Sequence, residues 1–186
     1  MSKRYLLISL IVIVLAVGTL FVMDRLPFCK CGVISVWSSD VTSNQQSQQL
    51  TDPYTVTHVL HGIGFYFLIW FVFRKKLTLG QRLVLAVGIE SGWEVLENTS
   101  FIIDRYRAAT ISFDYYGDSI FNSVGDILAM MIGFWVAAKL PWWGGLAAFV
   151  LLDLALLFFI RDSLIVNIIM LIRPIDAIKQ WQQQAN

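Results

Sequence analysis

Five long apolar stretches constrain the fold of this chain more than any other feature of its sequence. A helix needs about 20 mostly apolar residues to cross the hydrocarbon core of a bilayer. Stretches of this kind are residues 5–23, 56–73, 83–103, 120–138 and 144–160. Lipid offers the backbone no hydrogen-bond partner, so an apolar segment of this length that crosses a bilayer forms a helix, which satisfies its backbone groups internally. We therefore predict an all-α polytopic membrane helix bundle, with about five transmembrane helices in a single membrane domain that comprises residues 1–186.

The C-terminal region differs because its apolar stretch is short. Residues 163–172 are mostly apolar, and Arg173 and Pro174 follow directly. Such a stretch is too short to span a bilayer as a helix. We expect residues 163–186 to contain a short interfacial or re-entrant helix and a tail, with a tilted sixth span as the alternative.

Composition and charge also favour a membrane protein. Of the residues, 57% are hydrophobic and 15% are charged, whereas a soluble domain carries about 25% charged residues. The net charge of +1 argues against a nucleic-acid partner, because such domains show a basic stripe. Lys and Arg concentrate at the N-terminus and in the loop 74–82, which predicts a cytoplasmic N-terminus. The Ser- and Gln-rich segment 24–55 is then an outward-facing loop, which we expect to be solvated.

The third apolar stretch carries three carboxylates. Glu90, Glu94 and Glu97 are spaced so that they share one helix face. Ionisable residues inside a membrane are costly, and they indicate a functional site by default. Gly88 and Gly92 form a G-x-x-x-G pair on roughly the opposite side, which predicts close packing against another helix.

Polar residues of three spans are expected to meet near the outer surface. With a rise of about 1.5 Å per residue, His61, Glu97 and Asp126 lie within roughly 10 Å of that surface. Asp118, Asn122 and Asp126 repeat at every fourth position and share a face. The candidate catalytic residues are His61, Glu94, Glu97 and Asp126. The candidate substrate-binding residues are Glu90, Asn98, Arg105, Arg107, Asp118 and Asn122.

These residue types suit more than one chemistry. Paired carboxylates serve as general acid and base, and His61 serves as a proton carrier or a ligand. Arg105 and Arg107 suit an anionic headgroup, because a guanidinium group binds phosphate in a bidentate manner. In the alternative, these arginines pair with Glu97 and Asp118 and only hold helices together. A carboxylate and histidine metal site is a further alternative, but neither a metal nor a cofactor is assigned.

Cys29, Cys31 and His58 are left without an assigned role. A disulfide between two cysteines that are separated by one residue is strained, so free thiols, a bond to a partner protein and soft-metal binding all remain open. His58 and His61 form a loose H-x-x-H signal. We do not place His58 in the site, because a histidine at a membrane interface is easily solvated.

Several segments resemble one protein family. They are residues 27–32, 43–49 and 52–55, ESGWEVLEN at 90–98, IIDRYRAAT at 102–110, DYYGDSIFNSVGD at 114–126, and residues 160–162 and 178–182. Together they resemble uncharacterised protein family 0314, also called domain of unknown function 2585, from about Leu26 onward. The resemblance implies a multi-pass protein of the bacterial inner membrane and implies no reaction. The order of His61, Glu94, an arginine, Asp118 and Asn122 is more loosely similar to VanZ-like membrane proteins, which is a hint about the fold only.

The leading hypothesis is an integral inner-membrane protein with an outward-facing carboxylate, histidine and arginine pocket. We expect this pocket to bind or modify a lipid, a lipid-linked envelope precursor or another anionic small molecule, with membrane lipids as partners. One alternative is a small transporter or a metal-handling membrane protein. Another is a structural subunit of an envelope complex, whose protein partner the sequence does not identify. Whether the protein is an enzyme is left open.

Overall fold

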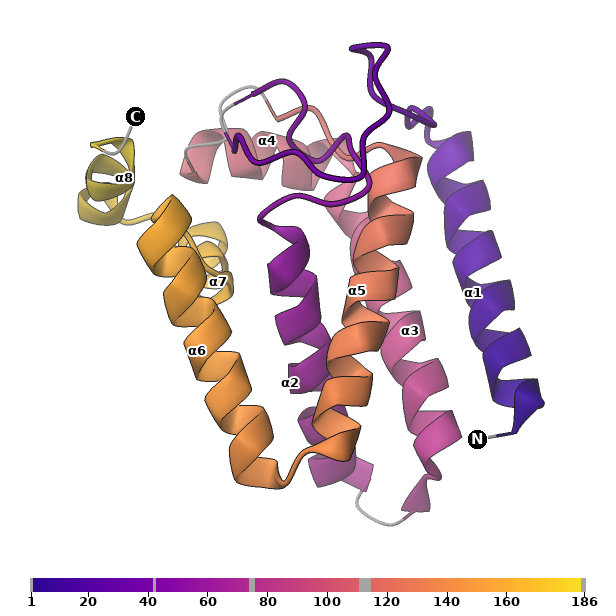
Figure 1. The fold of residues 1–186 in the computed structure, drawn as a ribbon. Helices are drawn as coiled ribbons and strands as arrows, with labels where there is room; N and C mark the ends of the chain where they lie inside the picture. The colour runs from indigo at the N-terminus through magenta and orange to yellow at the C-terminus, as the bar shows by residue number, and fades with distance from the viewer. Residues whose placement is uncertain (1, 42, 74–75, 111–114, 185–186) are drawn as a thin grey trace.

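The computed structural model describes residues 2–41, 43–73, 76–110 and 115–184 (Figure 1). These residues contain helices and no strand, apart from one isolated bridge between Trp37 and Thr51. The helices are α1 (Lys3–Val22), α2 (Thr55–Phe73), α3 (Leu79–Glu97), α4 (Ser100–Ala109), α5 (Ile120–Lys139), α6 (Trp142–Ile160), α7 (Leu164–Ile172) and α8 (Asp176–Gln183). The predicted all-α bundle is confirmed.

Four helices, α1, α2, α5 and α6, are long and apolar enough to cross a membrane. Many of their apolar side chains face outward, as Leu15 on α1 and Phe158 on α6 do, and a lipid environment would cover them. The helix α3 is as long as α2 and α6, but Arg82 and its three glutamates make it more polar. It packs against α1, α2 and α5, so it belongs to the same bundle.

The centre of the bundle is the contact between α2 and α5, with α3 and α1 on one side and α6 on the other (Figure 1). Glycines permit this close approach. A Cβ atom on Gly62 of α2 would collide with the carbonyl oxygen of Met130, and one on Gly133 of α5 would collide with that of Val59. Below these glycines, a buried apolar core that includes Phe134 joins α2, α3 and α5.

The predicted packing of Gly88 and Gly92 against another helix is wrong. Among the described residues, no heavy atom of another helix lies within 4 Å of a Cβ built on either glycine. The interhelical contact uses Gly62 and Gly133 instead. The G-x-x-x-G spacing shows that two small residues share one helix face. It does not show whether another helix packs against that face.

The range 83–103, which was expected to be one helix, is divided after Glu97. Asn98 ends α3, and its side-chain amide donates a hydrogen bond to the Glu94 carbonyl oxygen. Thr99 caps the next helix by accepting a hydrogen bond from the backbone N–H of Ile102. The short helix α4 therefore turns away and lies across the end of the bundle (Figure 1).

The C-terminal range 163–186 contains the two short helices α7 and α8. The nine residues of α7 give a length of about 14 Å, which is less than half of the roughly 30 Å hydrocarbon core. Ser163 caps α7 by accepting a hydrogen bond from the N–H of Val166. The helix α7 contacts α4 beside the bundle.

Candidate functional site

A cavity of about 650 Å³ lies among the helices beneath the loop that follows α1. Its polar lining lies toward the N-terminal end of α2 and the C-terminal end of α3. It consists of Gln46, Ser47, Tyr54, Thr57, His58, His61, Glu97, Tyr106, Tyr115, Asp118, Asp126 and Asn167. Its apolar lining consists of Leu60, Gly64, Phe65, Leu68, Ile89, Gly92, Trp93, Leu96, Phe149, Leu164, Ile168 and Leu171. The cavity is therefore amphipathic, with one polar end and a long apolar wall.

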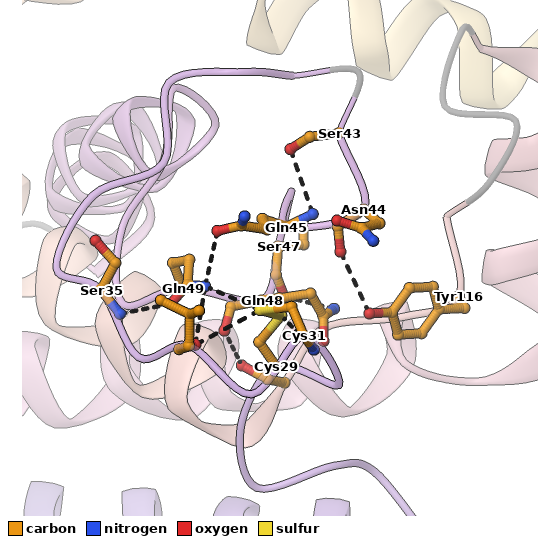
Figure 2. The surroundings of a disulfide bond; sticks show 12 residues. Cys29, Cys31, Ser35, Ser43, Asn44, Gln45, Ser47, Gln48, Gln49 and Tyr116 are labelled. Atoms are coloured by element: carbon orange, nitrogen blue, oxygen red, sulfur yellow. Dashed lines mark hydrogen bonds between the residues drawn. A yellow bond between two sulfur atoms is a disulfide. The ribbon is translucent and has the colours of Figure 1, made fainter.

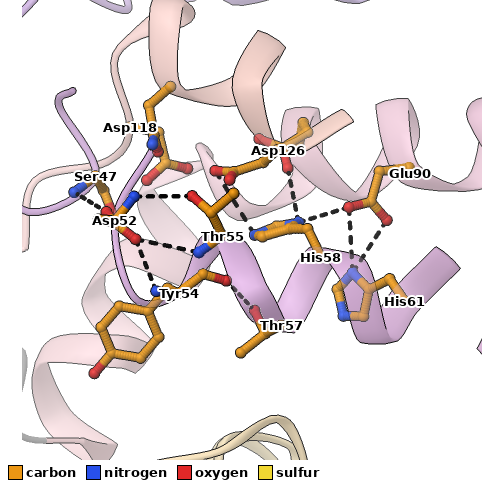
Figure 3. A network of polar contacts seen from close by, with 12 residues as sticks. Ser47, Asp52, Tyr54, Thr55, Thr57, His58, His61, Glu90, Asp118 and Asp126 are labelled. Carbon is orange, nitrogen blue, oxygen red and sulfur yellow. Dashed lines mark hydrogen bonds and ion pairs between the residues drawn. The ribbon is translucent and has the colours of Figure 1, made fainter. Parts of the chain in front are cut away.

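His58 is the centre of the polar end (Figure 3). Its Nδ1 atom lies 2.6 Å from Glu90 Oε1 and 3.4 Å from Glu94 Oε1, and its Nε2 atom lies 3.7 Å from Asp126 Oδ2. The imidazole thus joins α2 to both α3 and α5. Sequence reasoning left this residue out. Its spacing of three from His61, noted in the sequence as H-x-x-H, is the signal that pointed to it, because this spacing puts both rings on one side of α2.

His61 and Glu90 form the lower part of the same network. His61 Nδ1 lies 3.1 Å from Glu90 Oε2, and the imidazole stacks on Phe65. Glu90 is fully buried and pairs with both histidines. The structure therefore places Glu90 as the residue that orients the two rings.

Glu94 and Asp126 retain unused hydrogen-bonding capacity. Glu94 is fully buried, and among the described residues neither of its carboxylate oxygens has a hydrogen-bond partner. The Oδ1 atom of Asp126 also has none within the described chain. Glu97 lies one turn beyond Glu94 and lines the cavity beside Tyr106. Buried polar groups normally have partners, so this end of the cavity has the character of a binding site.

Asp118 closes the outer end of the cavity. It accepts hydrogen bonds from Asn98 Nδ2 and from the Tyr115 hydroxyl, both at 3.0 Å, while its own backbone N–H donates to Asn98 Oδ1. Burial raises the pKa of the Asp118 carboxyl to about 6. Asn122, the next residue on that face, donates from its amide to the Gln49 carbonyl oxygen and holds the loop rather than lining the cavity.

The structure does not bring Arg105 and Arg107 into the cavity. Arg105 donates to the carbonyl oxygens of Leu171 and Ile172 at the end of α7. Arg107 donates to the Tyr115 carbonyl oxygen. Both side chains lie on α4, and the break after α3 directs that helix across the end of the bundle. Their guanidinium groups therefore secure backbone segments, and neither is placed to clamp a headgroup inside the cavity.

The loop between α1 and α2 is not a simple solvated segment. Gln48 and Gln49 are buried. Gln48 donates from its amide to the Gly117 carbonyl oxygen, and the Gln49 side chain accepts from the Ser35 N–H (Figure 2). Because polar side chains can be buried when they satisfy backbone groups, these glutamines close the outer end of the bundle. The expectation of a solvated loop is wrong at these positions.

Cys29 and Cys31 are joined by a disulfide in the same region (Figure 2). Of the alternatives that the sequence left open, free thiols and soft-metal ligands do not describe this state. The bond lies beside Gln49, whose side-chain nitrogen is 3.6 Å from Cys31 Sγ. It therefore belongs to the loop that closes the bundle rather than to the polar end of the cavity.

Two buried aspartates escaped the sequence analysis. Asp52 precedes α2 and accepts hydrogen bonds from the backbone N–H groups of Ser47, Tyr54 and Thr55. Asp162 lies between α6 and α7, accepts from the Tyr54 hydroxyl at 3.1 Å, and is buried so that its pKa is raised to about 6. An aspartate just before a helix is an N-cap signal, which could have identified Asp52.

Two groups of side chains have the spacing to hold a metal ion. They are His58, His61 and Glu90, and His58, Glu94 and Glu97. In each group, one ligand atom per residue lies within 4.8 Å of the others. The glutamate of the first group is already hydrogen-bonded to both histidines, whereas the second group contains Glu94, which accepts no hydrogen bond among the described residues, and the cavity-lining Glu97.

Comparison with known proteins identifies relatives over almost the whole chain. The family model described as Protein of unknown function (DUF2585) matches residues 20–184. A UPF0314 protein of Paracoccus denitrificans is 45% identical over 94% of this chain and 90% of its own length. A UPF0314 protein of Sphingopyxis alaskensis is 41% identical over 97% of this chain and 96% of its own length.

No solved structure matches the chain. The looser similarity to VanZ-like proteins stays a prediction. The family resemblance drawn from the segments around Glu90 and Asp118 is confirmed by matches that cover both chains almost completely. This all-helical chain, with its amphipathic cavity, belongs to the UPF0314 family, whose family model carries the description DUF2585.

Proposed function

We propose that this protein binds a lipid or a lipid-linked molecule of the bacterial inner membrane in the amphipathic cavity. The observation that carries the proposal is the division of the cavity lining into a polar end around His58 and an apolar wall. A head with hydrogen-bonding groups fits the polar end, and a hydrocarbon tail fits the wall. Small-molecule sites are typically apolar cavities of about 300–1,000 Å³ with a few placed polar groups.

The apolar wall also supplies a route from the bilayer. Leu68, Ile89, Leu96 and Ile168 line the cavity and are between 39% and 55% exposed in the isolated chain. The cavity is therefore open on an apolar flank of the bundle. A lipid tail that enters from the membrane would keep its contact with apolar surface throughout.

The polar end favours a head with hydroxyl or amino donors. Glu97, Asp118 and Asp126 line it, and carboxylates accept hydrogen bonds from such groups. Glu97 and Asp126 come from different helices on either side of His58, which suits them to act as acid and base toward a bound head. With a cytoplasmic N-terminus, this end faces outward, so an envelope precursor on the outer leaflet is the substrate class that fits.

The test is to close the apolar wall without touching the polar end. Gly92 lines the cavity, and a Cβ built on it meets no atom within 4 Å, so Gly92→Leu fills cavity space. Gly88→Leu is the matched control, because Gly88 is equally open on the same helix and does not line the cavity. Native mass spectrometry of gently extracted protein measures the retained lipid.

We expect the wild type and Gly88→Leu to retain a lipid-sized ligand. The amount of ligand retained by Gly92→Leu should be at least tenfold lower. Equal retention by both variants would place the lipid elsewhere on the protein. No retained ligand in the wild type, across several mild detergents, would count against the proposal. The structural-subunit alternative predicts that neither glycine variant changes any ligand.

A further inference from the structure

The starting observation is a buried carboxylate that no hydrogen bond satisfies within the described chain. Glu94 is 0% exposed, and within the described residues both of its oxygens lack a hydrogen bond. Its ion-pair contact is with His58, whose Nδ1 atom is 3.4 Å from Glu94 Oε1 and closer, at 2.6 Å, to Glu90 Oε1. An uncompensated buried carboxylate is costly, and such groups in proteins are paired or coordinate a metal.

The neighbours of Glu94 supply the remaining ligands. One nitrogen of His58 and one oxygen each of Glu94 and Glu97 lie within 4.8 Å of one another. A cation placed among them needs only small side-chain movements to reach ligand distances of about 2.0–2.2 Å. The two glutamates follow each other by three residues on α3, and His58 faces them from α2.

A further carboxylate orients the histidine. Glu90 lies 2.6 Å from His58 Nδ1 and also contacts His61. In metal sites, a ligating histidine commonly bonds a second carboxylate, which fixes the orientation of the ring. Glu90 takes this position at Nδ1, so it orients His58 without being a ligand and leaves Nε2 as the nitrogen whose lone pair can bind a metal.

From these contacts we infer that His58, Glu94 and Glu97 bind a divalent transition-metal cation at the polar end of the cavity. One nitrogen and two carboxylate oxygens suit Zn²⁺ or Mn²⁺. Three protein ligands leave a coordination position open, and Glu97 lines the cavity, so that position faces the space where a ligand head would lie. The cation offsets the carboxylate charge that would otherwise repel a phosphate-bearing head. Only this last role rests on the proposed lipid binding.

The experiment uses the full chain in detergent, freed of metal with a chelator and titrated with Zn²⁺ or with Mn²⁺ alone. Isothermal titration calorimetry gives affinity and stoichiometry, and elemental analysis gives the metal content of the protein as purified. We expect one site per chain and at least tenfold weaker binding for Glu94→Gln and for Glu97→Gln. The matched control is Asp153→Asn, because Asp153 is also buried in the bundle but accepts its hydrogen bond from the Ile165 N–H, away from the cluster.

A second readout separates a metal site from a purely structural carboxylate. Zn²⁺ that binds the folded state raises the unfolding temperature, so the wild type and Asp153→Asn should gain stability with Zn²⁺ while Glu94→Gln and Glu97→Gln should not. Glu97 is only partly buried, so Glu97→Gln serves if Glu94→Gln fails to fold. A wild type that binds neither metal stoichiometrically, or variants that bind as tightly as the wild type, would overturn the inference.

Failure here is distinguishable from failure of the proposed function. Gly92→Leu should lose lipid and keep the metal, because Gly92 lies in the apolar wall and contributes no ligand atom. A protein that retains lipid without any metal would overturn the metal site alone. A protein that binds metal and retains no lipid would overturn the lipid proposal alone.

Discussion

At the scale of single residues, buried charges dominate this protein. His58, Glu90 and Glu94 lie within one network whose members come from two helices. Each charge placed in a low-dielectric interior requires a partner, a metal ion or a proton. The residues that carry this cost are the ones that line or support the cavity, whereas Arg105 and Arg107 lie outside it and bind carbonyl groups.

Asp162 gives a prediction for pH dependence. Burial raises the pKa of its carboxyl from 3.8 to about 6 in the folded protein, so the folded state holds the proton to higher pH than the unfolded chain does. Its contribution to stability is complete below pH 3.8 and is lost as the pH rises to about 6. The loss is on the order of 3 kcal/mol in the free energy of unfolding.

The measurement is the unfolding temperature in detergent at a series of pH values across that window. Asp162→Asn has no carboxyl group to titrate and keeps one oxygen, which can accept from the Ser163 N–H, so we expect a smaller decrease than in the wild type. Asp118 has a similarly raised pKa, so part of the decrease in unfolding temperature with rising pH should remain in Asp162→Asn. Identical pH profiles for the two proteins would contradict the prediction.

At the scale of helices, the contact between α2 and α5 holds the bundle together. It depends on backbone approach at Gly62 and Gly133, where a side chain has no room. The cavity lies on the other side of α2, among α3, α6 and α7. Close packing at one face of α2 therefore keeps His58 and His61 in position at another.

The helix contact predicts different outcomes for two glycines of α2. Gly62→Ala should lower the free energy of unfolding by about 1–3 kcal/mol, because the added Cβ collides with the Met130 backbone. In Gly64→Ala the new atom meets only Phe149 at 4.0 Å, so the gain in helix propensity of up to about 1 kcal/mol should leave stability equal or higher. Unfolding of both variants in mixed detergent measures the difference, and equal destabilisation would contradict the role of Gly62.

At the scale of the whole molecule, the start of α1 and the helix α8 lie at opposite ends of the bundle (Figure 1). The helices α1, α2, α3, α5 and α6 alternate in direction (Figure 1), and all of them except α3 are long and apolar enough to cross a membrane. We expect a cytoplasmic N-terminus from the basic residues of the N-terminus and of segment 74–82, and five crossings that include α3 would then place the C-terminus outside.

This topology predicts the behaviour of C-terminal fusions. Alkaline phosphatase attached after residue 186 should be active, because it folds only outside the inner membrane, and a green fluorescent protein at the same position should be dark. The reciprocal control attaches the two reporters between α2 and α3, where the pattern should reverse. A fluorescent C-terminal fusion would show that the number of crossings is even or that the N-terminus lies outside.

Much of the architecture follows from local pattern. The apolar stretches 5–23, 56–73, 120–138 and 144–160 coincide closely with α1, α2, α5 and α6, because the length and apolarity of a span are properties of contiguous residues. The spacing of Glu90, Glu94 and Glu97 correctly put them on one face for the same reason. The break after Glu97 was missed, although Asn98 and Thr99 are local cap signals, because the apolar residues continue through 101–103 and hide the end of the helix.

The sequence by itself determined the class of the protein, the family, and the presence of costly carboxylates within the bundle. Only the tertiary structure decided that His58 is their common partner, that Arg105 and Arg107 are used elsewhere, and that the polar end continues into an apolar cavity. The physical reason is that hydropathy and helical periodicity act over neighbouring residues. A cavity and its electrostatic partners instead depend on how helices distant in the sequence approach, and here glycines of α2 and α5 set that approach.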